Sequence, residues 1–202
     1  MNKYTVYEVY LKIIANSFVH SYVYTKSAQK RDELEQTNIG LQELSTTDEL
    51  TKILNRRGFM EVAQREIDFA SDLKLGGSVF FFDLDGLKKI NDTWGHSIGD
   101  KAIQVAARVL RDSFQTSDIV GRLSGDEFAV ISPGFIKTNA EFIRGRIADL
   151  SEKYSKEENL PFVVSTSLGI VQFDEENHDI DKLLFKADKE LYKEKKIKHS
   201  RD

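Results

Sequence analysis

The stretch that decides the fold reads Gly-Gly-Ser-Val-Phe-Phe-Phe-Asp-Leu-Asp-Gly, residues 76–86. Its centre, from Val79 to Phe82, is a short and fully apolar run with glycines before it and a polar loop after it. A continuous apolar run of this length is typical of a strand that is buried on both faces of a sheet. We therefore expect a central strand that carries Asp83 and Asp85 at its C-terminal end.

A second stretch, residues 119–132, predicts a β-hairpin. It begins with the apolar run 119–123 and turns at Ser124-Gly125-Asp126. From Glu127 to Ser132 the apolar side chains then alternate between the two faces of an extended strand.

Helices are predicted on either side of these strands. Apolar residues recur at helical steps over 100–114, 140–153 and 180–196, and 162–171 has the composition of a further strand. The chain therefore belongs to the α/β or α+β class, with one central sheet flanked by helices.

Residues 1–44 are predicted to form a separate helical segment. They contain Gly40 as their one glycine and no proline, and their second half, 26–44, is highly polar with a thin apolar seam. Such a seam pairs with another helix, either as a coiled-coil-like linker and dimer contact or as a helix that packs on its own domain. The main domain is expected over 45–202.

Composition limits the classes of function. The chain has 29 Lys and Arg against 33 Asp and Glu, a net charge of −4, so no overall positive field favours a nucleic-acid partner. It has no cysteine, which excludes disulfides, thiol nucleophiles and Cys-ligated zinc and agrees with the cytoplasmic location that we expect. Charged and polar residues interrupt the most apolar N-terminal stretch, 4–24, so we expect neither membrane insertion nor a signal peptide.

The acidic residues at the ends of the two strand stretches predict a metal site. If the hairpin pairs with the central strand, Asp126 and Glu127 meet Asp83 and Asp85. Four carboxylates in one place raise each other's pKa unless a cation neutralises them. Oxygen ligands select Mg²⁺, or Mn²⁺ as the alternative, and a magnesium ion that keeps exchangeable waters suits nucleotide phosphates. The competing interpretation is that these acids are ordinary solvated turn residues.

Five stretches match one family pattern in chain order. They are 48–57 (DELTKILNRR), 82–100 (FDLDGLKKINDTWGHSIGD), 122–128 (RLSGDEF), 165–169 (STSLG) and 187–192 (ADKELY). Together they resemble the GGDEF family, the bacterial diguanylate cyclases. The matches extend from residue 46 to about 195, and in this order they are far more specific than any one of them alone.

The resemblance implies a fold like that of nucleotidyl cyclases and polymerase palms, with a mostly antiparallel central sheet flanked by helices and preceded by the N-terminal helix. It also implies a reaction in which a homodimer condenses two molecules of GTP into cyclic di-GMP and releases two pyrophosphates. The metal ligands would be Asp83, Glu127, Asp126 and the Leu84 carbonyl, with Asp126 and Glu127 as catalytic residues. Asp126 would either deprotonate the ribose 3′-hydroxyl or share a metal, and both roles stay open.

The same resemblance implies that Asn91 and Asp100 read guanine. Asp100 can accept from the N1–H and 2-amino groups of guanine, which adenine lacks, so GTP is favoured over ATP. The competing interpretation is that Asn91 caps a turn and Asp100 caps the following helix. Trp94 and His96 are interpreted as structural residues.

Phosphate binding is expected at the start of a helix. The backbone N–H groups of Gly86, Leu87 and Lys88 would face the phosphates there, since the first N–H groups of a helix lack intrahelical partners. The side chains of Lys88 and Lys195 would add positive charge.

Three departures from the family pattern are visible. Ser124 replaces the first glycine of the usual turn, and its side chain would be strained if its φ were positive. Residues 115–118 read Gln-Thr-Ser-Asp where the product-inhibition motif is R-x-x-D, so feedback inhibition should be weak unless Arg111 substitutes. Lys198 and His199 stand where the family usually has Gly-Arg.

Two alternatives to an active cyclase stay open. One is a catalytically weak or inactive domain that binds GTP or cyclic di-GMP and regulates a partner. The other is a dimerisation or signalling module in which the helix over 1–44 is the working part.

Overall fold

The computed structural model describes residues 24–26, 30, 46–135 and 140–199, and it divides the chain into two units, Met1–Ser45 and Thr46–Asp202. In the first unit, residues 24–26 and 30 are helical, and the rest of the predicted N-terminal helix lies outside the described residues. In the described part of the chain, no helix is long and apolar enough to cross a membrane.

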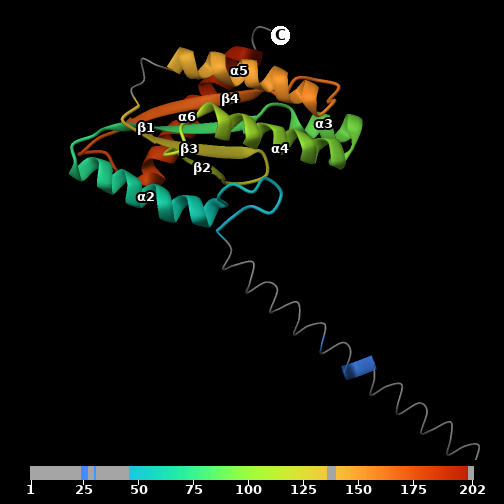
Figure 1. The fold of residues 1–202 in the computed structure, drawn as a ribbon, viewed down its shortest axis with the longest axis horizontal. Helices are drawn as coiled ribbons and strands as arrows, with labels where there is room; N and C mark the ends of the chain where they lie inside the picture. Colours follow the sequence, from blue (N-terminus) through green and yellow to red (C-terminus); the bar gives the residue numbers. More distant parts are fainter. Residues whose placement is uncertain (1–23, 27–29, 31–45, 136–139, 200–202) are drawn as a thin grey trace, which may run out of the picture. The chain divides into compact units, whose positions relative to one another are not determined.

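The second unit contains four strands and five helices among its described residues (Figure 1). In chain order they are α2 (Arg56–Asp72), β1 (Gly77–Leu84), α3 (Leu87–Trp94), α4 (His96–Ser113), β2 (Ile119–Arg122), β3 (Glu127–Pro133), α5 (Ala140–Glu157), β4 (Thr166–Phe173) and α6 (Ile180–His199).

The strands form one antiparallel sheet in the order β2-β3-β1-β4. β1 therefore lies inside the sheet between β3 and β4, and β2 and β3 form the hairpin. This confirms the predicted central strand, the hairpin and the antiparallel sheet flanked by helices. β4 begins at Thr166, later than the predicted start at 162, and Phe162 lies outside the sheet with its ring 4.9 Å from that of Trp94, centroid to centroid.

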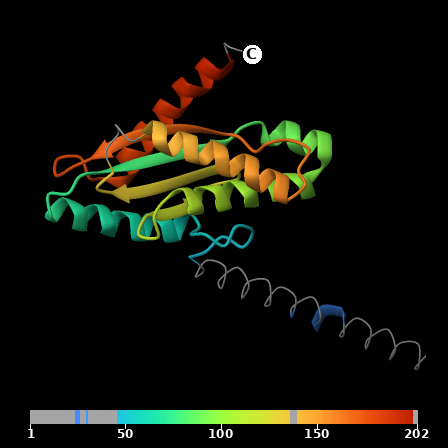
Figure 2. The ribbon, with the colours of Figure 1, turned by 45° about the horizontal axis from the view of Figure 1, so that its top comes forward.

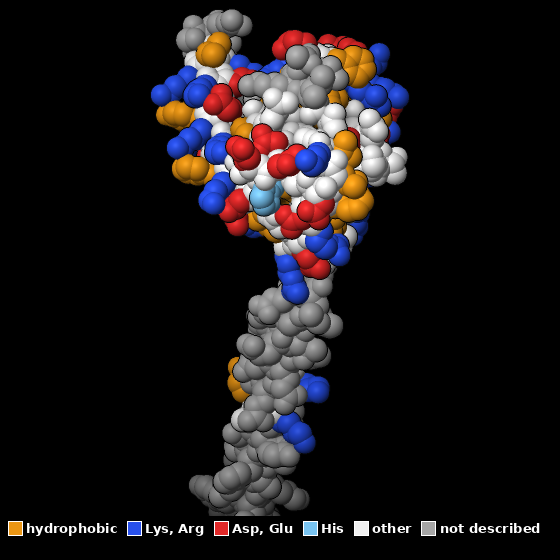
Figure 3. Space-filling model, turned by 90° about the vertical axis from the view of Figure 1, so that its left-hand side faces the viewer, with side chains coloured by type: hydrophobic (Ala, Val, Ile, Leu, Met, Phe, Trp, Pro, Cys, Tyr) orange, Lys and Arg blue, Asp and Glu red, His pale blue; other side chains and the backbone are white. Residues whose placement is uncertain are grey.

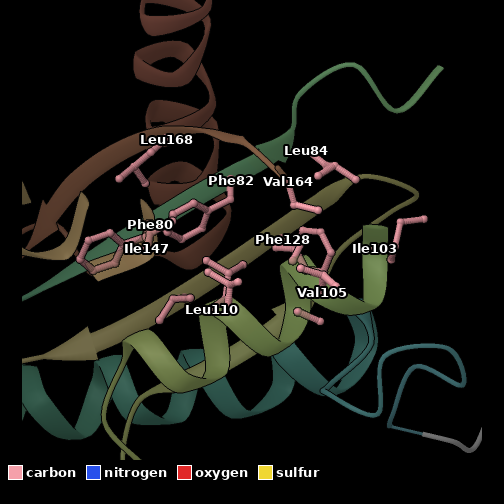
Figure 4. Packing of buried hydrophobic residues seen from close by; sticks show 14 of the residues in the cluster. Phe80, Phe82, Leu84, Ile103, Val105, Leu110, Phe128, Ile147, Val164 and Leu168 are labelled. Atoms are coloured by element: carbon pink, nitrogen blue, oxygen red, sulfur yellow. The ribbon is translucent and has the colours of Figure 1, made fainter. Parts of the chain in front are cut away.

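The two faces of the sheet carry separate hydrophobic layers because successive side chains of a strand point to opposite sides. Phe80, Phe82 and Leu84 of β1 contact the layer formed with α4 and α5. Val79 and Phe81 contact the layer formed with α2 and α6. Figures 1 and 2 show α4 and α5 in front of the sheet and α6 behind it, and Figure 4 shows the first layer from close by.

α2 begins where the sequence provides a cap. The Oδ1 atom of Asn55 accepts a hydrogen bond from the Gly58 N–H at 2.9 Å, which satisfies one of the free donors of the first turn. Phe59 and Ile67 on the same helix are fully buried against the sheet.

Figure 3 shows the end of the sheet at which β1 begins. Acidic side chains gather there around a histidine, with lysines and apolar side chains alternating along the side covered by α6. A surface pocket at this end is lined by Asp68, Ser71, Asp72, Lys74, Glu175 and His178. The acidic ends of β1 and β3, from which the site is built, lie at the opposite end of the sheet.

Replacing Phe82 tests the assignment of the first layer. Its ring is fully buried, lies parallel to the Phe80 ring and meets the Phe114 ring edge-on. We expect Phe82→Ala to lower the free energy of unfolding by about 3–5 kcal/mol, measured by urea unfolding, because it leaves a cavity in the core. Phe142→Ala, at a ring that is 70% exposed, is the control and should change the value by less than about 0.5 kcal/mol. Equal losses in the two variants would contradict this core assignment.

Candidate active site

The register of β1 and β3 brings the acidic ends of two strands together. Asp83 lies directly opposite Glu127, and the Leu84 N–H donates to the Asp126 carbonyl oxygen at 2.9 Å. Cross-strand partners share one face of a sheet, so the side chains of Asp83 and Glu127 project on the same side. By the alternation along β1, this is the side that α6 covers.

Asp85 has partners of its own. Its carboxylate accepts hydrogen bonds from Ser167 Oγ at 2.6 Å, Ser165 Oγ at 2.8 Å and Lys198 Nζ at 2.9 Å. Burial raises the pKa of Asp85, but these hydrogen bonds and the Lys198 charge outweigh it and hold the pKa below its usual range. The expectation that the clustered carboxylates raise each other's pKa unless a cation neutralises them therefore does not hold for Asp85, whose pKa is lowered by groups of the fold itself. The sequence pattern of the strand could not reveal that residues of β4 and α6 donate hydrogen bonds to Asp85.

The pKa of Asp83 is raised although a lysine contacts its carboxylate. Burial raises the pKa of Asp83, and the charges of Asp126 and Asp85 add to it, although Lys195 Nζ lies 2.5 Å from Asp83 Oδ1 and opposes the shift. A carboxylate whose pKa stays raised beside an ammonium gains from a second cation.

The donors present fit a hard cation. Within the described residues, no three Asp, Glu or His side chains are grouped to hold a metal ion by themselves. A cation at this place would use the Asp83–Glu127 pair together with backbone, water or substrate oxygens, which is the oxygen chemistry that Mg²⁺ requires.

The turn between β2 and β3 is not strained at Ser124. Positive φ angles outside glycine occur, among the described residues, at Lys52, Lys74 and Asn159. The Ser124 hydroxyl donates to Glu127 Oε2 at 2.5 Å. The condition for strain, a positive φ at Ser124, is therefore not met, and the Ser124 side chain contacts Glu127 instead.

Arg122 and Asp48 hold this turn in place, a role that sequence analysis missed. Arg122 donates from Nε and Nη2 to the Gly125 carbonyl oxygen, at 3.1 and 2.7 Å, and from Nη1 to both carboxylate oxygens of Asp48, at 3.1 and 3.2 Å. Asp48 also accepts from the Thr51 N–H and hydroxyl. An arginine three residues before the turn glycine was the available signal, since its fork of donors suits a carbonyl and a carboxylate together.

Asn91 and Asp100 lie on neighbouring helices beside the same buried glycine. Asn91 is inside α3, and its buried Oδ1 accepts no hydrogen bond in the described structure. Asp100 is exposed inside α4 and follows Gly99, whose missing side chain leaves the space that the Asn91 amide occupies. The helix cap of α4 is Gly95, so the interpretation of Asp100 as its cap is wrong. A buried amide oxygen without a donor calls for an explanation, and a bound water, an ion or a ligand would each supply the missing partner.

The predicted phosphate residues lie at the start of α3. Gly86 takes a left-handed conformation, with φ of +72°, and precedes the first helical residues, Leu87 and Lys88. No side chain caps this helix start, so its first N–H groups remain available to an anion. Lys88 is exposed, and Lys195 contacts Asp83.

The chain matches the family model described as diguanylate cyclase, GGDEF domain, over residues 45–201. It belongs to the GGDEF domain family. Two curated relatives are from Escherichia coli strain K12. Diguanylate cyclase DgcP is 37% identical over 169 residues, which cover 83% of this chain and 49% of the relative. Probable diguanylate cyclase DgcC is 31% identical over 175 residues, which cover 87% of this chain and 47% of the relative.

The chain thus spans about half the length of these two relatives. A solved structure of the GGDEF domain of TpbB (YfiN) from Pseudomonas aeruginosa is also similar. It is 31% identical with a TM-score of 0.66, covering 74% of this chain and 88% of that chain. The GGDEF fold predicted from the sequence is therefore confirmed.

Asp118, at the position of the product-inhibition motif, forms hydrogen bonds within this GGDEF domain. Asp118 accepts from the Gln115 N–H at 2.8 Å and from Ser132 Oγ at 2.9 Å. Arg111, the residue named above as a possible substitute for the missing arginine, donates to its neighbour Asp112 at 3.3 Å. Both groups are thus engaged within the chain.

The clamp on the turn predicts a pH dependence of stability. Burial raises the pKa of Asp48, but the hydrogen bonds from Thr51 and the Arg122 charge outweigh it, so the folded pKa lies below the unfolded value of 3.8. The stabilisation is therefore complete above that value and is lost as the pH falls through the folded pKa. We expect Asp48→Asn to lower the free energy of unfolding by roughly 1–3 kcal/mol at pH 7.

The difference in free energy of unfolding between the wild type and Asp48→Asn should become smaller as the pH approaches 3. Urea unfolding at a series of pH values measures this difference. Asp72→Asn, at an exposed position, is the control and should follow the wild type throughout. A deficit that is the same at every pH would show that the Asp48 charge does not stabilise the turn.

Proposed function

We propose that this chain is a cytoplasmic diguanylate cyclase, which condenses two molecules of GTP into cyclic di-GMP and releases two pyrophosphates. The observation that carries the proposal is the in-register pair of Asp83 and Glu127 at the end of β1 and β3. The unpartnered amide oxygen of Asn91 and membership in the GGDEF family support it further.

Each half of the reaction forms one phosphodiester bond. The ribose 3′-hydroxyl oxygen of one GTP attacks the α-phosphorus of the other, the bond to the pyrophosphate breaks, and the hydroxyl gives up its proton. Asp126 either takes this proton or helps to hold a metal, since a carboxylate that binds metal ions is a poor base. The second half repeats the exchange with the roles of the two nucleotides reversed, which closes the ring.

Asp83 and Glu127, with the Leu84 carbonyl, would hold Mg²⁺, and Asp126 would join them by a change of its side-chain position, since no three acidic side chains of the described residues are already grouped for a metal. When bound, this ion would supply charge neutralisation for the triphosphate and lower the pKa of the attacking hydroxyl. Glu127 is held in orientation by Ser124 before any ligand arrives. Preorganised ligands of this kind account for most of the catalysis in phosphoryl transfer, where the protein mainly positions groups and balances charge.

The start of α3 and the pair of Asn91 and Asp100 would bind the substrate at its two ends. The N–H groups of Gly86, Leu87 and Lys88 would face the phosphates. At the other end, the Asn91 amide and the Asp100 carboxylate would meet the Watson–Crick edge of guanine. Adenine would leave the Asp100 carboxylate without donors, which disfavours ATP.

The reaction requires two active sites that face each other, because each domain presents one 3′-hydroxyl to the α-phosphate of the other nucleotide. We therefore propose a homodimer as the working form, with residues 1–44 as the contact between subunits.

A second candidate is a GGDEF domain that binds GTP or cyclic di-GMP without turnover. The observation in its favour is the contact of Ser124 with Glu127 Oε2, which occupies one oxygen of a proposed metal ligand.

Glu127→Gln separates these functions. Incubated with GTP and Mg²⁺, the wild-type chain should produce cyclic di-GMP, detected by chromatography, and the variant should produce it at least about 100-fold more slowly, since one charged transition-state contact is lost. Glu158→Gln makes the same change at an exposed site and should retain wild-type activity. Bound but unchanged GTP in the wild type would support the second candidate, and neither product nor binding would support a signalling module. Both results contradict the cyclase proposal.

Gly99→Ala tests the position of Asn91. A Cβ at residue 99 would overlap with Asn91 Oδ1, so the amide must move. We expect about tenfold weaker GTP binding by calorimetry, equivalent to about 1.4 kcal/mol, and a smaller preference for GTP over ATP. Gly145→Ala is the matched control, because a Cβ there has open space on α5. Wild-type affinity in Gly99→Ala would show that Asn91 does not bind the base.

A further inference from the structure

Lys198 attaches the end of α6 to the end of β1 and to β4. Its Nζ lies 2.9 Å from Asp85 Oδ2, 2.9 Å from the Thr166 carbonyl oxygen and 3.1 Å from Ser167 Oγ. An ammonium has three N–H donors, and these acceptors can use all of them. The side chain is therefore held at its tip although it is 41% exposed.

Glu194, one helical turn earlier, makes a second attachment to the same strand. Its Oε1 accepts from the Leu168 N–H at 3.1 Å, and its Oε2 pairs with Arg144 of α5 at 2.6 Å. β4 is at the edge of the sheet formed by the described strands, so none of these strands pairs with its outward backbone groups. The Thr166 carbonyl and the Leu168 amide are two such groups, and side chains of α6 satisfy both.

Lys195 lies between these attachments and contacts Asp83. Lys195 and Lys198 are three residues apart on a helix, and Asp83 and Asp85 are two apart at the end of a strand, so each pair shares a face. The two lysine–aspartate contacts consequently fix both the rotation and the axial position of the last turn of α6. The described part of α6 runs to His199, and the two contacts hold its last described turn against the sheet.

We propose that Lys198 is a positioning residue for the reaction proposed above. It holds the last described turn of α6 so that the Lys195 ammonium keeps its contact with Asp83 and faces the phosphates that would bind there. It acts through Lys195 and does not itself touch the substrate. Since the GGDEF pattern has Gly-Arg where this chain has Lys198 and His199, this anchor is a property of the chain's own sequence.

Lys198→Met tests the anchor because it keeps most of the aliphatic stem and removes the ammonium. We expect amide hydrogen exchange over residues 190–199 to become about tenfold faster, as the last turn opens more often. We also expect KM for GTP to rise about tenfold while kcat stays within about twofold, because the contact of Lys195 is lost equally from bound GTP and from the transition state. Lys198→Arg should restore most of both quantities.

Lys196→Met is the matched control. It removes a neighbouring lysine whose ammonium lies over the Tyr192 ring, away from these acceptors, and it should leave exchange and KM at wild-type values. Asp85→Asn should reproduce the faster exchange of Lys198→Met, and the double variant should add nothing further, because both changes break one contact.

Unchanged exchange in Lys198→Met would overturn the proposal, as would equal effects in Lys196→Met. Faster exchange with wild-type KM would also overturn it, since the anchor would then be structural alone. If the wild-type chain makes no cyclic di-GMP, the proposed function fails, and calorimetric affinity for GTP replaces KM. Weaker binding in Lys198→Met together with faster exchange would then support the anchor, and unchanged binding would overturn it.

Discussion

The antiparallel pairing of β1 with β3 is the constraint on which the rest of the domain depends. Because its register places Asp83 opposite Glu127, it also places Phe82 opposite Phe128, so one alignment sets both the core and the acidic pair. A slip by one residue would turn every side chain of β1 to the other face and exchange buried phenylalanines for carboxylates. The apolar run in the middle of the strand is thus what makes the position of the acids at its end so well defined.

Placing acids at the buried end of a central strand has an electrostatic cost, and this chain offsets much of it with α6. Asp83 and Asp85 each contact a lysine of that helix, yet the directions of their pKa shifts differ. Burial raises both, but Asp85 also receives two serine hydroxyls and ends below its usual range, whereas Asp83 ends above it. The difference separates a carboxylate whose needs are met within the fold from one that still gains from an added cation. Asp85 is thus held by groups of the fold itself, which agrees with the proposal that Asp83 rather than Asp85 binds the metal.

The sequence was informative where the signal is local. An apolar run between glycines and polar residues defines β1, and a small-residue turn between alternating segments defines the hairpin. α2 received no predicted range because three of its five buried residues, Gly58, Ala63 and Ala70, are small and contrast weakly with their polar neighbours. The contacts that complete the site join distant segments: Arg122 and Asp48 are 74 residues apart, and Lys198 and Asp85 are 113 apart. Such pairs cannot be predicted from the periodicity of the sequence, since each partner taken alone is typical of a charged surface residue.

The geometry of the turn shows what the replacement of the usual glycine by Ser124 changes. A glycine at this place would offer backbone freedom and space, but the turn does not use a positive φ here, so the freedom is not required. What the serine takes away is space, and what it adds is a hydroxyl donor to Glu127 Oε2. A carboxylate has two oxygens and about four acceptor sites, so Glu127 can keep this hydrogen bond and still present its other oxygen to a cation. The substitution therefore bears on how closely a nucleotide approaches the turn, and it leaves the acidic pair itself in place.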